Sequence, residues 1–153
     1  MLIIIVLMFP VILVAGTKPE VMHIETPFGV MEYTSEKVLP NGIRLVEFTA
    51  SGEWGDAWEG TYVQYIKGVE KNDKWSYDGW GIFEGVVHTS SGDLEGTVYY
   101  RIRNTINFDP FRFYGAQLTI ISGTGELANI RGTGDLNYDP DLPWIDMSVH
   151  FDP

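Results

Sequence analysis

The sequence predicts an all-β fold, a small closed antiparallel β-barrel of about eight strands. Short runs rich in β-branched and aromatic residues alternate with turn signals at close intervals beyond residue 42. Glycine accounts for 17 of 153 residues and aromatic residues for 14% of the chain, a pairing that favours strands and tight turns over helices. No window beyond residue 16 sustains the apolar period of a helix over three turns.

A closed barrel is favoured over a β-sandwich, the alternative architecture for many short antiparallel strands. Many of the glycines lie inside the predicted strands rather than between them. Glycine inside a strand marks a bulge or a sharp bend, and a small barrel needs such bends in order to close.

The predicted elements follow one another in a simple order. Residues 17–42 are expected to form an irregular N-terminal segment, because prolines and glycines interrupt them repeatedly. A β-barrel domain is expected over residues 43–153, with strands over 43–50, 58–66, 79–89, 94–103, 112–122, 126–130, 133–138 and 144–151. Loops are expected over the charged residues 69–78 and over residues 104–110.

Residues 1–16 have the features of a signal peptide or an N-terminal anchor. Residues 2–15 carry no charge and end in Val14-Ala15-Gly16, small residues of the kind that signal peptidases cleave. The run is shorter than the roughly 20 residues of a membrane helix, so no stable membrane span is expected. No Lys or Arg precedes it, which leaves two alternatives open: an uncleaved membrane anchor, or a true start at Met22 or Met31 and a cytoplasmic protein. Cleavage would give a secreted or extracytoplasmic protein.

Charge and missing residue types exclude several kinds of partner and site. The chain has 21 acidic and 10 basic residues, a formal charge of −11, and such a field repels phosphate backbones, so no nucleic-acid partner is expected. The absence of cysteine excludes disulfides and thiolate sites. The histidines at positions 23, 88 and 150 are not spaced as metal ligands, so no metal is predicted.

One segment fits a nucleotide-binding pattern by letter but not by context. Residues 123–128 match the dinucleotide fingerprint G-x-G-x-x-A and follow an apolar strand. Further glycines follow the match where the fingerprint needs a helix, and the chain ends too soon for a βαβ unit. We therefore predict a hairpin turn here and no cofactor.

The same glycine-rich segment carries a resemblance to a known family. Residues 123–134 read GTGELANIRGTG, and a similar phrase precedes the last strands in a bacterial family of unknown function. Residues 82–89, followed by Gly92-Asp93-Leu94-Glu95-Gly96, look like that family's preceding strand and turn. The likeness covers about residues 79–138. It implies the barrel of plant allene oxide cyclase, which that family shares, and it implies no activity, because one fold hosts many functions.

Two titratable residues are the candidates for catalysis. Strand geometry places Glu84 and His88 on one face together with Trp80. If that face points into the barrel, the two side chains are buried polar groups of the kind found in functional sites. The competing register places Phe83 and Val87 inward and leaves Glu84 in solvent.

Five further residues are candidates for ligand binding. Each is an aromatic or amide side chain on a largely apolar strand face: Tyr62, Gln64, Trp80, Tyr100 and Gln117. A buried amide or hydroxyl without a partner costs about 1–3 kcal/mol, so each needs a partner or a ligand. Ordinary core packing is the alternative role for the three aromatic residues.

Three functions are compatible with these observations. The first is binding of a small apolar or amphipathic molecule in the barrel cavity, where this architecture usually holds its ligands. The second is a cofactor-free cyclase or isomerase that uses the same cavity. The third is an exported carbohydrate-binding domain, suggested by Trp54, Trp58, Trp75 and Trp80 beside acidic residues. The sequence leaves open whether the protein is an enzyme and whether it forms oligomers.

Overall fold

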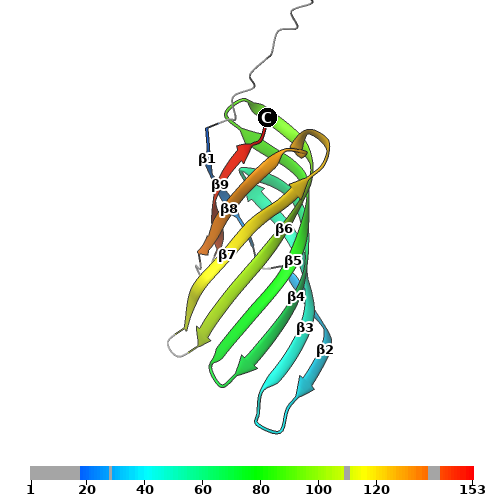
Figure 1. Cartoon of the computed structure of the whole chain (residues 1–153), viewed down its shortest axis with the longest axis vertical. Coiled ribbons are helices and arrows are strands. Elements are labelled where there is room, and N and C mark those ends of the chain that lie inside the picture. The colour runs from blue at the N-terminus through cyan, green and yellow to red at the C-terminus, as the bar shows by residue number, and fades with distance from the viewer. Residues whose placement is uncertain (1–17, 28, 109–110, 138–141) are drawn as a thin grey trace, which may run out of the picture.

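The computed structural model consists almost entirely of antiparallel strands (Figure 1). It describes residues 18–27, 29–108, 111–137 and 142–153. The strands are β1 (Glu20–Glu25), β2 (Val30–Val38), β3 (Arg44–Asp56), β4 (Trp58–Lys71), β5 (Lys74–Thr89), β6 (Gly92–Phe108), β7 (Phe111–Gly123), β8 (Ile130–Asn137) and β9 (Trp144–Phe151). A single turn of 3-10 helix, η1 (Gly125–Leu127), lies between β7 and β8. Residues 1–16, predicted as a signal peptide or anchor, lie outside the described residues.

Eight of these strands form a closed ring of backbone ladders. The order runs β1-β9-β8-β7-β6-β5-β4-β3, and β1 returns to β3 through the pairs Ile24↔Asp56 and Glu25↔Gly55. The ninth strand, β2, pairs with the first half of β3 and lies outside the ring. The predicted all-β fold and its antiparallel ring of about eight strands are confirmed, with one difference, because only one end of the structure is closed.

The other end is an open, curved sheet built from the far halves of β2 to β7 (Figure 1). The strands β8, β9 and β1 are short and stay at the closed end, whereas β4, β5 and β6 span 14, 16 and 17 residues. At the open end β2 and β7 are therefore the two edges of the sheet, and the concave face between them is accessible from outside.

Period-2 alternation decides which side chains enter the interior. Along β4, each even-numbered residue from Tyr62 to Glu70 is buried and each odd-numbered residue is exposed. The facing strands continue the same layers, as in the row that pairs Ala50, Gln64, Gly81 and Tyr100 across β3 to β6. Each layer of the interior is thus supplied by several strands, which is how a small barrel fills its core.

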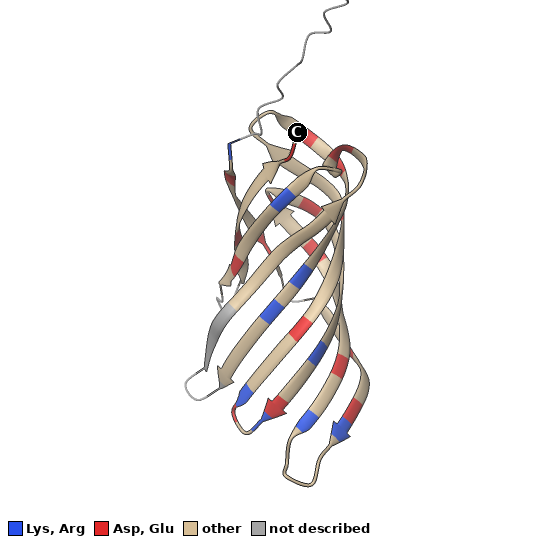
Figure 2. Ribbon diagram, in the orientation of Figure 1, with Lys and Arg blue, Asp and Glu red and all other residues tan. Residues whose placement is uncertain are grey.

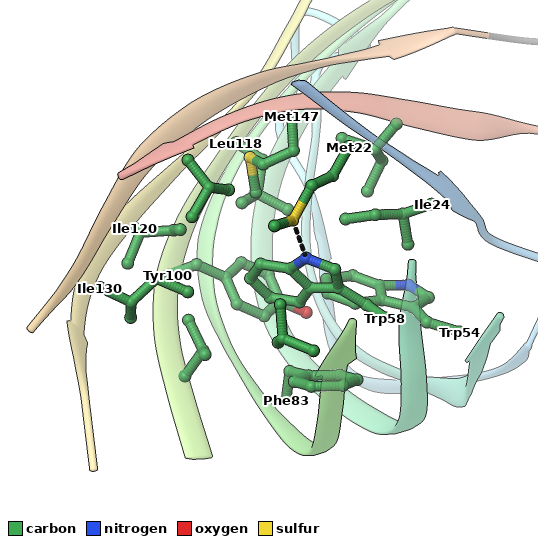
Figure 3. Packing of buried hydrophobic residues seen from close by; sticks show 14 of the residues in the cluster. Met22, Ile24, Trp54, Trp58, Phe83, Tyr100, Leu118, Ile120, Ile130 and Met147 are labelled. Atoms are coloured by element: carbon green, nitrogen blue, oxygen red, sulfur yellow. Dashed lines mark hydrogen bonds between the residues drawn. The ribbon is translucent and has the colours of Figure 1, made fainter. Parts of the chain in front are cut away.

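The closed end holds the main core, shown in Figure 3. Its largest side chains are aromatic: Trp54 stacks on Phe83 with ring centroids 5.4 Å apart, and Trp58 lies 5.0 Å from the same ring. The indole Nε1 of Trp58 points at the sulfur of Met22, 3.3 Å away, which ties β1 to the core. A second, smaller cluster of Val46, Phe48, Ile66 and Ile102 covers the concave face of the open end.

Three sequence expectations about local structure were wrong. Residues 17–42 are not irregular, because β1 and β2 occupy residues 20–25 and 30–38. The loops expected over 69–78 and 104–110 are mostly strand: β4, β5 and β6 extend through these polar residues as long hairpins. Residues 126–130, expected as a strand, instead contain η1 and the turn into β8.

Charged residues of both signs are interspersed along the strands (Figure 2). Several form pairs between neighbouring strands on the outer wall, such as Lys67 with Glu47 and Arg101 with Asp78. Exposed pairs of this kind contribute little to stability, about 0–1 kcal/mol each. Within the described ranges, no helix has the length and apolar character needed to cross a membrane.

Candidate functional site

The concave face of the open end contains a cavity of about 220 Å³. Five strands of the open end and β8 supply its walls, which are mainly aliphatic and aromatic. The lining residues are Met31, Phe48, Ala50, Gln64, Ile66, Tyr77, Ile102, Asn104, Ile106 and Leu136. We call this the inner cavity. Apolar walls with a few fixed polar groups are the usual composition of a small-molecule site.

The floor of the inner cavity is a buried hydrogen bond. Gln64 Nε2 donates to the hydroxyl oxygen of Tyr100 over 3.1 Å, and both side chains are at least nine-tenths buried. Burial raises the pKa of the Tyr100 hydroxyl well above its usual range, so this group stays protonated. Beyond this hydrogen bond, the aromatic core fills the interior of the closed ring of strands, so the cavity has no exit toward the closed end.

One polar atom beside the inner cavity has no partner. Oδ1 of Asn104 is buried and accepts no hydrogen bond from the described part of the chain. An acceptor left in this state costs about 1–3 kcal/mol, which makes it an unusual feature of a folded protein. Asn104 lines the cavity, and rotation about its last side-chain bond would turn either the amide oxygen or the amide nitrogen toward a bound molecule.

A charged network forms the rim of the cavity at the open end. Glu70 is only 2% exposed, and its two carboxylate oxygens accept hydrogen bonds from Arg44 Nη1 and from the Tyr77 hydroxyl at 2.5 and 2.9 Å. Arg44 Nε also donates to Glu36, at 3.0 Å. Burial, together with the bond to Glu70, raises the pKa of the Tyr77 hydroxyl far above its usual range. We call Glu36, Arg44, Glu70 and Tyr77 the rim.

Three of the five predicted ligand-binding residues lie in the interior. Gln64 lines the inner cavity and Tyr100 is its hydrogen-bond partner. Tyr62 lies one layer deeper, stacked on Trp54 at 5.3 Å, and belongs to the aromatic core rather than to the cavity wall. The alternative of core packing therefore describes Tyr62, while Gln64 and Tyr100 form the floor.

The predicted inward orientation of Glu84 and His88 is wrong. Phe83 and Val87 are fully buried, whereas Glu84 is exposed on the outer wall. His88 also lies on the outer wall, where its Nδ1 is 2.8 Å from Asp93 Oδ1 and its Nε2 is 3.5 Å from Glu59. The physical reason is that Phe83 and Val87 bury more apolar surface inside than a carboxylate and an imidazole would, and one register cannot bury both sets.

Trp80 and Gln117 also face outward. Trp80 is 51% exposed and stacks on Tyr65, with ring centroids 4.3 Å apart, and Gln117 is exposed on β7. Trp80 was predicted on the same face as Glu84, and that prediction is correct, but the face is the outer one. The tryptophans expected to form a sugar platform separate, because Trp54 and Trp58 are buried in the core.

The outer wall has a groove of its own, beside the stacked pair of Tyr65 and Trp80. Its volume is about 770 Å³, and it extends across β2 to β7. Besides the two rings, it is lined by paired charges and hydroxyl groups: Thr34, Glu47, Thr49, Lys67, Asp78 and Arg101. Arg101 binds Asp78 through two parallel hydrogen bonds of 3.0 and 2.6 Å. We call this the outer groove.

Sequence reasoning missed the rim and most of the inner cavity wall. Glu70 and Tyr77 fell in a segment expected to be a loop, and so did Asn104 and Ile106. The sequence did contain a signal for Glu70. Alternate residues of a strand share one face, so Glu70 lies on the same face of β4 as Tyr62 and Gln64. Nothing in the sequence distinguishes Arg44 as its partner, since that contact joins β3 to β4.

Comparison with known proteins supports the fold alone. No protein-family model matches the chain, and no curated protein matches its sequence. Among solved structures, it is similar to a protein of unknown function from the DUF3224 family of Shewanella oneidensis MR-1, with a TM-score of 0.63 and 14% sequence identity. The match covers 91% of this chain and 99% of that one. The expected likeness to a family of unknown function is thus met at the level of fold.

The described residues contain no cluster of three or more His, Asp or Glu side chains that could hold a metal ion. The polar groups that line the inner cavity are the amides of Gln64 and Asn104 and the hydroxyl of Tyr77. The rim adds one buried carboxylate whose oxygens are already bonded.

Proposed function

We propose that the protein binds a small apolar or amphipathic molecule in the inner cavity. The observation that carries this proposal is an apolar cavity closed at one end by the Gln64–Tyr100 hydrogen bond, open at the other, and lined by Asn104, whose amide oxygen is buried without a partner. Apolar walls provide the driving force for burial of the ligand, and the amide side chains would orient it.

The size of the inner cavity limits the ligand. A closed apolar cavity of ~150 Å³ accommodates a benzene-sized guest, and the inner cavity measures about 220 Å³. A single substituted ring or an alkyl chain of similar bulk would fill it. A larger molecule, such as a long-chain lipid, would not fit inside, and part of it would project from the open end between β2 and β7.

A cofactor-free cyclase of the allene oxide cyclase type is less well supported than binding. Proton transfer near neutral pH needs a group whose pKa lies close to that pH. The only titratable side chain that lines the cavity within the described residues is Tyr77, and its pKa is raised far above neutrality. Glu84 and His88, the residues on which a cyclase mechanism depended, lie on the outer wall.

A cavity-filling variant tests the binding proposal. Ile106→Trp places a large ring in the inner cavity, and Val21→Trp adds the same ring at an exposed position of β1, outside both the cavity and the outer groove, as a control. We expect 1-octanol or toluene to bind saturably to the wild type, to raise its Tm by mass action, and to bind the control equally. Binding should be lost in Ile106→Trp. Unchanged binding in that variant, or no binding to the wild type, would contradict the proposal.

A second candidate function is binding of a neutral saccharide in the outer groove. The observation that favours it is the exposed Tyr65–Trp80 stack beside the Asp78–Arg101 pair. Aromatic rings contact the C–H faces of sugars, and planar charged groups bond to neighbouring hydroxyls. Trp80→Ala should abolish retention of the protein on an oligosaccharide column, with Val21→Ala, an exposed residue of β1 outside the groove, as the control. Equal retention of wild type and Trp80→Ala would exclude the groove.

We further propose that residues 1–16 direct export and are removed. The uncharged apolar run and the small residues at positions 14–16 support this proposal. Expression from the native start should give an extracytoplasmic protein whose N-terminal sequence begins at residue 17. Sequencing that finds Met1 would indicate an anchor, and Met22 or Met31 would indicate a later start.

A further inference from the structure

We propose that the inner cavity selects ligands by their head group: it accepts an alkyl chain that ends in a hydrogen-bond donor, an alcohol or an ammonium, and discriminates against a carboxylate. The inference rests on the proposed binding function and specifies the class of ligand. Two separate features of the site carry it, the unpartnered amide oxygen of Asn104 and the charge balance of the rim.

Asn104 provides an acceptor that needs a donor. Its Oδ1 lies beside the apolar wall and has no hydrogen bond from any described residue. A hydroxyl or an ammonium group can donate to this oxygen, whereas a carboxylate offers only acceptors. A carboxylate could bond only to the amide nitrogen, and it would leave Oδ1 of Asn104 without a partner.

The rim provides an excess of negative charge. It holds two carboxylates, Glu36 and Glu70, against one guanidinium, Arg44. Two of the Arg44 nitrogens already donate to these carboxylates, and the Tyr77 hydroxyl proton is directed to Glu70. An anionic ligand would therefore meet a net negative rim whose guanidinium is shared by two carboxylates, while a cationic head would find oxygen acceptors.

The field of the whole chain acts in the same direction. A formal charge of −11 repels anions in solution and attracts cations before contact. This long-range contribution falls with added salt, whereas the contacts of the rim and of Asn104 are screened much less. Measurements at two salt concentrations thus separate the two contributions.

The test compares three ligands with one chain length, octylammonium, 1-octanol and octanoate, by isothermal titration calorimetry at neutral pH. The charged compounds are kept below their micelle concentrations and 1-octanol below its solubility. We expect octylammonium and 1-octanol to bind at least about tenfold more tightly than octanoate, since two charged or hydrogen-bonding contacts differ between them. All three should lose binding in Ile106→Trp. The preference should persist when salt is raised.

Two variants assign the preference to its sources. Asn104→Leu removes the unpartnered oxygen with little change of shape, so it should weaken 1-octanol binding about three- to tenfold while Tm stays equal or rises. Glu36→Gln should reduce the octylammonium preference. Its control is Glu47→Gln, which makes the same change of net charge on the outer wall, where Glu47 pairs with Lys67.

The outcomes separate this inference from the proposed function. If octanoate binds as tightly as octylammonium and Ile106→Trp abolishes both, the cavity binds ligands without head-group selection and the inference is wrong. An equal loss in Glu36→Gln and Glu47→Gln would assign the effect to net charge and contradict the role of the rim. If no octyl compound binds to the wild type, the proposed function itself fails.

Discussion

The ring of Tyr100 lies directly against the backbone of Gly81, its partner across the β5–β6 ladder. A Cβ atom at position 81 would come within 2.4 Å of the ring carbon Cζ. Tyr100 is only 1% exposed and holds the hydrogen bond from Gln64, so its ring has no room to retreat. The absent side chain of Gly81 is therefore what allows the cavity floor to form.

Gly81→Ala tests this contact. Forcing a methyl group into a packed interior typically costs about 1–3 kcal/mol, so we expect the free energy of unfolding in urea to fall by that amount. Gly55→Ala is the control, because a Cβ there would meet no atom nearer than 3.8 Å. If both variants unfold at the same urea concentration, the Tyr100 ring is not confined as described.

Adjacent substitutions in β5 test its register. Phe83→Ala removes a fully buried ring and should destabilise the protein by about 3–5 kcal/mol. Glu84→Ala alters a side chain on the outer wall and should leave the urea midpoint nearly unchanged. A larger loss of stability in Glu84→Ala than in Phe83→Ala would show that Glu84 points inward. The inner cavity would then not have the walls described above.

The buried carboxylate of the rim should matter more than an exposed one. Glu70→Gln weakens its bonds with Arg44 and Tyr77 in a buried setting, so we expect a loss of about 1–3 kcal/mol in the free energy of unfolding. Glu47→Gln breaks the exposed pair with Lys67 and should have almost no effect. Chemical denaturation of both variants at pH 7 makes the comparison. Equal stability would show that the rim is solvated.

His88 gives the fold a pH dependence of known sign. Its hydrogen bond to Asp93, with a smaller effect of Glu59, raises the pKa of the imidazole above its usual value of 6.5. Because the pKa is higher in the folded protein, the stabilisation is complete below pH 6.5 and is lost as pH rises through the folded pKa. An NMR titration should show the raised pKa, with a larger decrease in Asp93→Asn than in Glu59→Gln. An unshifted pKa in the wild type would contradict the pairing.

The sequence was sufficient for the fold class because alternation is clear where one strand face is polar. In β6, the buried Val98 and Tyr100 alternate with the exposed Tyr99 and Arg101, so the apolar face on which Tyr100 was predicted is the inner one. β5 gave no such contrast: Trp80 and Ile82 on one face oppose Phe83 and Val87 on the other. Both faces are apolar because the outer wall carries the outer groove, so periodicity alone could not decide which face was buried.

The site was harder to predict, because its residues meet only across strands. Gln64 and Tyr100 were identified singly as buried polar groups. They become partners because both pair with Gly81 of β5, whose missing side chain lets them meet across that strand. The strands β1 and β2 escaped detection for different reasons: β1 has only two buried residues, Met22 and Ile24, and β2 has none. The hairpins of β4, β5 and β6 continue beyond the closed ring, and their strands there carry many polar residues. For that reason their sequences resemble those of loops.

The closure of the ring has a consequence for how the protein assembles. The first strand, β1, pairs with the last, β9, so the ring cannot be completed until the C-terminal residues have left the ribosome. Until β9 emerges, β1 and β8 each expose an unpaired edge, which is the state in which nascent β-proteins associate with one another. The joint itself is short, since β1 and β3 share the pairs Ile24↔Asp56 and Glu25↔Gly55. Contacts between residues so distant in sequence form slowly, in milliseconds to seconds, so closure is the step that a chaperone would have most time to assist.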